Sequence, residues 1–361
     1  MSVLRTLPTV DGLAVTLEQD ALLHRPWYDL RSQSLFEESF RVDVAEIDES
    51  LERMIAGPRQ GRRCLLCRTH TGPSRAARLT GPLHTCCDGR RTADDPRRVE
   101  GGLMAYPIRI GVQIQPQHAD YAQIRATLAA TEEAGVDIAF NWDHFFPLYG
   151  EPDGKHFECW TMLGAWAEAT SRVEIGALVT CNSYRNPDLL ADMARTVDHI
   201  SGGRLVLGIG AGWAQRDYDA YGYPFGTAGS RLADLADALP RIKKRWAQLN
   251  PPPTREIPIL IGGGGEKKTL RYTAEHATIW HGIGAPATIA HKVQVLDAHC
   301  ADIGRDPAEI ERSAKVDVPP EEVADELLTA GITLFTVSTS GPDYDLGLLK
   351  SWLAWRDSRE A

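Results

Sequence analysis

The 361-residue chain lacks a long apolar run, a basic net charge and a recognisable leader. No stretch approaches the roughly 20 apolar residues that cross a bilayer, so we expect no membrane partner. The N-terminus lacks the basic, apolar and small-residue order of a signal peptide. The net charge of -10 argues against nucleic-acid binding, which relies on a basic face. These absences predict a soluble cytoplasmic protein.

Lysine is also missing from the N-terminal part of the chain, and the first lysine of the sequence is Lys155. Residues 54–100 are rich in Arg, Pro, Gly and Thr without a sustained apolar period, and only residues 34–54 show helical spacing. Such a segment cannot bury enough apolar surface to offset its chain entropy. We therefore expect residues 1–103 to form a largely disordered extension, or the natural protein to begin at Met104.

The seven cysteines form no disulfide framework, which fits a reducing compartment. A zinc site in the extension is conceivable, and its candidate ligands are Cys64, Cys67, His70, His84, Cys86 and Cys87. However, Cys86 and Cys87 are adjacent, whereas zinc sites usually space such a pair as Cys-x-x-Cys. We predict no metal site.

After Met104, apolar β-branched runs alternate with amphipathic stretches. The predicted strands are residues 108–113, 136–140, 173–179, 205–209, 257–261, 278–280, 310–316 and 333–337. The predicted helices are residues 121–134, 159–170, 187–200, 230–249, 267–276, 287–303, 320–330 and 346–357. Eight such pairs in roughly 255 residues match a (β/α)8 TIM-type barrel over residues 104–361. A doubly wound open sheet shows the same alternation, but the count of eight favours the barrel.

The active site of such a barrel lies at the C-terminal ends of its strands. The second predicted strand ends in Asn-Trp-Asp-His-Phe-Phe, residues 141–146. Here Asp143 stands beside His144 among aromatic rings, which suits a proton carrier with a group that orients it. In the alternative interpretation, Asp143 caps a turn and His144 is a surface histidine.

A run of four glycines, residues 262–265, follows the fifth predicted strand and precedes a helix opened by Glu-Lys-Lys. Free backbone N–H groups at a helix N-terminus bind phosphate, and lysines add positive charge. The alternative is a flexible turn that closes a strand. The Gly-x-Gly-x-Gly-Trp stretch from Gly208 lacks the Rossmann spacing, but its glycines would let a flat ligand approach.

These motifs resemble the luciferase-like monooxygenase superfamily. The resemblance rests on residues 176–187 (GALVTCNSYRNP), 198–204 (DHISGGR) and 208–213 (GIGAGW). Trp142–Phe145 and the 261–265 loop resemble its deazaflavin branch, which uses coenzyme F420. The luciferases proper tend to carry Glu-His-His rather than Asp-His at this strand end. The likeness covers residue 106 to the C-terminus and implies a TIM-type barrel with the cofactor ring across its mouth.

The resemblance also implies roles for single residues. His144 would be the catalytic proton carrier. Asp143 would contact the cofactor ring, and Thr180 would hydrogen-bond it. Ala177 and Leu178 would form a bulge behind the ring, often with a non-proline cis peptide. The remaining cofactor-binding positions would be Ala211 and Gly212 along the ring, and Gly262, Gly263, Gly264 and Gly265 around the phosphate.

One position departs from the family pattern. Sugar-phosphate dehydrogenase members carry a glutamate base after the strand-four glycines, where this chain has Trp213, so the substrate stays open. We predict an oxidoreductase that moves a hydride between F420 and an organic substrate. The alternatives are an FMN-dependent monooxygenase and a non-catalytic cofactor binder. Dimerisation is common in the family, so a homodimer is a further expectation. Aromatic residues near the strand ends suggest a bulky apolar substrate, unless they pack on one another.

Overall fold

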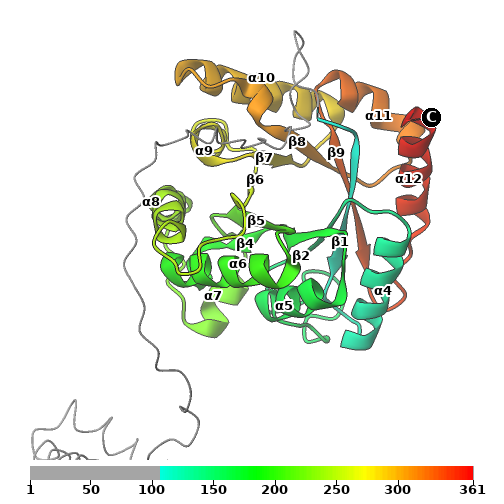
Figure 1. Cartoon of the computed structure of the whole chain (residues 1–361), viewed down its shortest axis with the longest axis horizontal. Helices are drawn as coiled ribbons and strands as arrows, with labels where there is room; N and C mark the ends of the chain where they lie inside the picture. The colour runs from blue at the N-terminus through cyan, green and yellow to red at the C-terminus, as the bar shows by residue number, and fades with distance from the viewer. Residues whose placement is uncertain (1–105, 361) are drawn as a thin grey trace, which may run out of the picture. The chain divides into compact units, whose positions relative to one another are not determined.

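The computed structural model describes residues 106–360, which form a closed barrel of parallel strands surrounded by helices (Figure 1). The predicted extension and its candidate zinc ligands lie outside the described residues. Within residues 106–360, no cluster of three or more His, Cys, Asp or Glu side chains is placed to hold a metal ion. The same part of the chain has no helix that is long and apolar enough to span a membrane.

The strands alternate with helices along the whole described chain. The strands are β1 (Arg109–Gln115), β2 (Ile138–Asn141), β3 (Glu174–Ala177), β4 (Thr180–Cys181), β5 (Leu205–Gly210), β6 (Ile259–Gly262), β7 (Ile279–Gly282), β8 (Glu311–Val316) and β9 (Leu334–Ser340). The helices are α4 (Tyr121–Glu133), α5 (Cys159–Ala169), α6 (Pro187–Ser201), α7 (Gln215–Tyr221), α8 (Ala228–Trp246), α9 (Thr269–His276), α10 (Pro286–Asp302), α11 (Pro320–Thr329) and α12 (Gly347–Glu360), with short 3-10 turns η3 (Asn182–Tyr184) and η4 (Pro307–Glu309).

The barrel closes because β1 pairs in parallel with both β2 and the last strand, β9. Neighbours then follow in chain order, and β3 and β4 are two segments of one strand that both pair with β5. This confirms the TIM-type barrel and its eight predicted strand–helix units. The third strand is interrupted at Leu178–Val179, where the family resemblance implies a bulge with a non-proline cis peptide. One detail differs from the sequence prediction: α7 is an additional seven-residue helix.

The helix ends follow the local sequence. Asn186 caps α6 by accepting a hydrogen bond from the Asp188 N–H, and Pro187 occupies the first turn, where its missing N–H costs nothing. Gly202 ends the same helix in the left-handed conformation, at φ 66°. The predicted start and stop of this helix are thereby confirmed.

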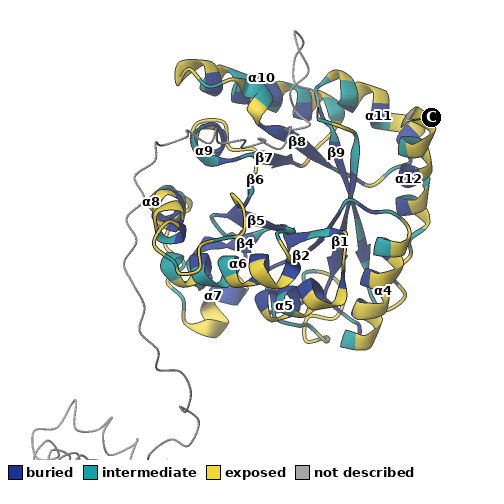
Figure 2. Ribbon diagram, viewed as in Figure 1, coloured by how far each residue is buried: buried dark blue, intermediate teal, exposed yellow. Residues whose placement is uncertain are grey.

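Two apolar layers fix the position of the site. The larger layer lies between the strands and the helices, and Figure 2 shows the strands dark blue and the outer helix faces yellow. The smaller layer fills the barrel interior; its members are Ile138, Phe140, Val206, Leu260, Ile279 and Leu334, with Leu178 and Val179 packed against it. Because this plug occupies the middle of the strands, the space that remains lies at their C-terminal ends.

The interruption of the third strand determines the shape of that space. The Leu178–Val179 peptide is cis, and Val179 leans over the neighbouring strand β5. A Cβ at Gly210 would lie 2.8 Å from Val179 Cγ2, and a Cβ at Gly208 would lie 1.9 Å from the Ala177 oxygen. Gly208 is therefore required by a close backbone contact and Gly210 by a close contact with the Val179 side chain, which explains the Gly-x-Gly spacing without phosphate binding.

We expect Gly208→Ala to destabilise the protein by about 2–4 kcal/mol, because the new methyl group meets backbone that cannot rotate away. Gly164→Ala in α5 is the matched control, since a Cβ there meets nothing within 4 Å. That variant should gain roughly 0.5–1 kcal/mol from helix propensity. Urea denaturation of both variants measures the difference, and equal stabilities would contradict the tight contact.

Candidate active site

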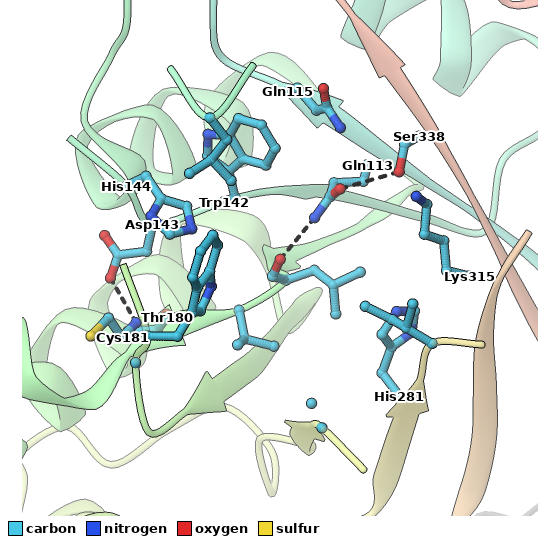
Figure 3. A pocket seen from close by; sticks show the side chains of 18 of the residues that line it. Gln113, Gln115, Trp142, Asp143, His144, Thr180, Cys181, His281, Lys315 and Ser338 are labelled. Atoms are coloured by element: carbon cyan, nitrogen blue, oxygen red, sulfur yellow. Dashed lines mark hydrogen bonds between the residues drawn. The ribbon is translucent and has the colours of Figure 1, made fainter. Parts of the chain in front are cut away.

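A cavity of about 310 Å³ opens at the C-terminal ends of the strands. Its wall combines residues of β1, β4, β6, β7, β8 and β9 with the residues that follow β2, β3, β4 and β5 (Figure 3). Most of the lining is apolar or neutral, and the polar groups come from different strands that only the barrel brings together. This is the position at which barrels of this type carry their active sites.

Asp143 lies in the cavity wall, but its carboxylate is already bound by protein. It accepts two hydrogen bonds from Arg185, at 2.6 and 3.0 Å. It accepts a third from the Cys181 N–H at 3.0 Å (Figure 3). Burial raises the pKa of Asp143, and the Arg185 guanidinium and the Cys181 N–H oppose that rise. Arg185 also reaches Glu158, the residue that caps α5. Asp143 thus ties β4 to the end of β2.

His144 forms a second buried pair, with a partner that the sequence did not single out. Its Nδ1 lies 2.7 Å from Oδ2 of Asp217 on α7. Asp217 also accepts hydrogen bonds from the Phe145 N–H and the Tyr184 hydroxyl. Burial alone would raise the pKa of Asp217, but these hydrogen bonds, led by that from His144, lower it below its ordinary value.

An ionised Asp217 keeps the proton of His144 on Nδ1. Among residues 106–360 the second ring nitrogen, Nε2, has no hydrogen-bond partner, so it is available to a molecule in the cavity. Trp142 and Trp213 stand edge-on to the imidazole with ring centroids 5.7 and 5.6 Å away. The two indoles restrict the ring to this orientation.

The loop after β2 is fixed against its neighbours. Trp142 donates through Nε1 to His156 Nε2 at 2.9 Å, and the planes of the two rings are 7° apart, so the rings lie nearly coplanar, edge to edge. Burial, and then the nearby His144, lower the pKa of His156 to about 4. His156 is therefore neutral at physiological pH and can accept this hydrogen bond. Leu148 and Tyr149 of the same loop line the cavity.

Two neutral groups present hydrogen-bonding atoms at the bulge. Trp160 donates to Thr180 Oγ1 at 3.2 Å, which leaves the hydroxyl proton of Thr180 free for an acceptor in the cavity. Gln113 donates from Nε2 to the Leu178 oxygen at 2.8 Å and accepts from Ser338 (Figure 3). Gln113 therefore holds the bulge from the opposite strand.

The glycine loop lies partly in the cavity. Gly262 and Gly263 line it, whereas Gly264 and Gly265 lie outside its lining. Gly263 has φ 130° and its N–H bonds to the His281 oxygen. A Cβ at Gly264 would lie 3.5 Å from Lys292 Cε, so a lysine flanks the loop, although its ammonium is paired with Glu266. The helix α9 starts at Thr269, two residues later than the predicted start at Lys267.

Most of the predicted site residues meet at this cavity. Asp143, His144, Leu178, Thr180 and Gly212 line it, together with the two glycines of the loop. Ala177 is buried against the helix layer, and Ala211 is also absent from the lining.

The aromatic residues divide into two groups. Trp142, Tyr149 and Trp213 line the cavity, and Trp213 is 66% exposed. Phe145 instead stacks on Tyr221 with ring centroids 3.9 Å apart. Part of the predicted aromatic pocket is therefore a packed cluster outside the cavity.

The structure adds residues that sequence reasoning missed, among them Asp217, Lys315 and Ser338. Asp217 lies on the helix that was not predicted. Lys315 and Ser338 alternate with apolar residues along β8 and β9, a pattern that does not reveal which face of a strand points into a barrel.

The fold and cavity define a TIM-type barrel with its site at the strand ends. The family model for luciferase-like monooxygenases matches residues 102–335, so the chain belongs to this family. It is 30% identical over 153 residues to an F420-dependent glucose-6-phosphate dehydrogenase of Amycolatopsis mediterranei, covering 37% of this chain and 45% of that protein. A protein of the same name from Kineococcus radiotolerans is 27% identical over 176 residues, covering 44% of this chain and 52% of that one.

The chain spans about half the length of these two relatives.

Among solved structures, an F420-dependent secondary alcohol dehydrogenase in complex with an F420-acetone adduct superposes with a TM-score of 0.62 at 17% identity, covering 69% of this chain and 98% of that one. The long-chain alkane monooxygenase LadA superposes with a TM-score of 0.57 at 12% identity, covering 71% and 92%. At these identities the likeness shows the fold alone.

We expect Arg185→Met to destabilise the protein by about 3 kcal/mol, because it leaves the buried carboxylate of Asp143 without its cation. The double variant Asp143→Asn/Arg185→Met removes both charges and should recover much of that loss. Thermal and urea denaturation at pH 7 compare the variants. If the double variant were no more stable than Arg185→Met, the pair would not be the source of the effect.

Proposed function

We propose that the protein is an oxidoreductase that moves a hydride between the deazaflavin F420 and an organic substrate. The observation that carries this proposal is the cavity itself, in which an apolar wall at Leu178–Val179 faces His144 and its buried carboxylate partner. Two curated relatives named as F420-dependent dehydrogenases support the choice of cofactor. An FMN-dependent monooxygenase is the alternative, because the fold is shared by a monooxygenase. It is less favoured because the two relatives are named as F420-dependent.

The described residues fit such a cofactor. Leu178 and Val179 present the apolar surface on which a flat ring would rest, and Thr180 offers a free hydroxyl proton. Gly262 and Gly263 expose backbone beside this wall, where a bulkier residue at 262 would come within 3.1 Å of Val179 Cγ1. When bound, F420 supplies the hydride acceptor or donor. Asp143 would position the cofactor contact indirectly: its carboxylate accepts the Cys181 N–H and so fixes the backbone next to Thr180.

His144 would handle the proton. Its Nδ1–H is committed to Asp217, so proton exchange with the substrate occurs at Nε2. Asp217 fixes the tautomer and stabilises the charge that His144 gains when it takes up a proton. Trp213 lies beside His144 and carries no carboxylate that could share the proton transfer. His144 would therefore carry out the acid–base step alone.

A cytoplasmic location stays a prediction. It is supported by Cys159, Cys181 and Cys300, which are free and buried in the described part of the chain. The homodimer also stays a prediction.

Titration of the full chain with F420 and with FMN tests the choice of cofactor. Trp142 and Trp213 line the cavity, so quenching of tryptophan fluorescence reports binding directly. We expect F420 to bind at least about ten-fold more tightly than FMN, a difference of about 1.4 kcal/mol. Tighter FMN binding would reverse the ranking.

We expect His144→Ala to lower turnover by about 10²- to 10⁴-fold, because it removes the proton carrier. Asp217→Asn should cause a smaller loss, about 10-fold or more, because Nδ1 keeps a partner but loses its charge. F420 affinity should change by less than about two-fold in both, since neither residue is placed to bind the cofactor. Turnover is followed at the F420 absorbance with a panel of alcohols, ketones and enones.

Asp219→Asn is the matched control, since Asp219 is exposed on the same helix as Asp217. Its turnover should equal that of the wild type. Unchanged turnover in His144→Ala would remove this residue from the mechanism. Absence of turnover in the wild type across the whole panel, together with tight F420 binding, would favour the non-catalytic binder.

A further inference from the structure

The charges that face the cavity do not balance. Among its described lining residues, Asp143 is neutralised by Arg185, and His281 is neutral because burial, and then Lys315, lower its pKa to about 4. The imidazole of His144 is paired with Asp217. Lys315 on β8 also lines the cavity, and no acidic residue in the described chain forms an ion pair with it. The cavity therefore holds one ammonium group without a counter-charge.

The neighbours of Lys315 are neutral hydrogen-bonding groups. On β7, His281 bonds through Nδ1 to Ser313 Oγ at 2.9 Å. Lys315 itself is in register with Thr336 on β9, and Ser338 lies two residues further along that strand. Figure 3 shows Lys315, His281 and Ser338 across the pocket from Asp143 and His144. These groups form a polar wall opposite the proton carrier.

A half-buried ammonium surrounded by neutral groups loses hydration without gaining an ion pair. Such a group is matched when an anion enters the cavity, where the reduced dielectric strengthens the pairing. We propose that Lys315 binds a carboxylate of the substrate through its ammonium group. The inference rests on the proposed function in taking this cavity as the reaction site.

A carboxylate fits better than a phosphate. The polar wall offers one ammonium and a few hydroxyl groups, whereas a phosphate dianion is usually held by several cations or by a nest of backbone N–H groups. The rim of the same cavity is apolar: Ile283 and Trp213 both line it, and they are 72% and 66% exposed. The substrate class is therefore an organic acid with an apolar body.

The test compares the full-length wild type with Lys315→Met and with Lys350→Met, an exposed lysine on α12 that serves as the matched control. The probes are benzoate and octanoate, their neutral amides benzamide and octanamide, and inorganic phosphate. Binding is measured by tryptophan fluorescence, with and without F420. The F420 affinity of each variant is measured separately.

We expect Lys315→Met to weaken binding of the two carboxylates by about ten-fold or more, the usual effect of losing a charge-assisted hydrogen bond. Amide binding and F420 affinity should change by less than about two-fold, because neither uses the ion pair. Lys350→Met should behave as the wild type. The melting temperature of Lys315→Met should equal or exceed that of the wild type, since an unpaired charge is removed, and Lys315→Gln provides a second folded variant.

Three results would overturn the assignment. Carboxylates that bind no better than their amides, or equally to the wild type and Lys315→Met, would show that Lys315 binds no acid. A ten-fold loss of F420 affinity in Lys315→Met would show that Lys315 binds an anionic group of the cofactor rather than of the substrate. Phosphate that binds more tightly than either carboxylate would change the substrate class. Lys315-dependent carboxylate binding in a protein that binds no F420 would refute the proposed function and leave this site standing.

Discussion

The contact of the interrupted third strand with its neighbours organises the whole site. Glycine at 210 leaves room for the Val179 side chain, which leans over β5, and glycine at 208 leaves room for the Ala177 carbonyl. Gln113 holds the Leu178 oxygen from across the barrel. The strand therefore resumes at Thr180 in a fixed position, with its hydroxyl at the cavity wall. Without this contact the barrel would remain, but the apolar wall would not.

Two buried carboxylates next to this wall have separate tasks. Asp143 is bound by Arg185 and the Cys181 N–H, so it acts on the backbone of β4 and stabilises the wall. Asp217 is bound to His144 Nδ1 and thereby leaves Nε2 as the nitrogen that would exchange the proton in the proposed function. The adjacent residues Asp143 and His144 look like an acid–imidazole pair in the sequence. In the barrel each has a different partner, because successive side chains at a strand end point in different directions.

The barrel was predictable because its signals are local. Apolar runs, helix caps such as Asn186-Pro187 and the helix stop at Gly202 act within a few residues, and each appears in the structure close to where the sequence places it. The interruption at Leu178–Val179 was not visible as a break in the apolar run 173–179, and only the family resemblance implied a bulge there. The short helix α7 was missed because seven residues carry too little periodicity to be distinguished from a loop.

The family, the barrel and the strand end that carries His144 can all be read from the amino-acid sequence. The partner of His144 depends on long-range packing, since Asp217 lies 73 residues further along the chain and reaches it from α7. The tertiary structure also decides that Lys315 faces the cavity. Strand alternation defines two faces, but the closed curvature of the sheet selects the inner one. Local chemistry specifies elements, whereas long-range pairing specifies which side chains meet.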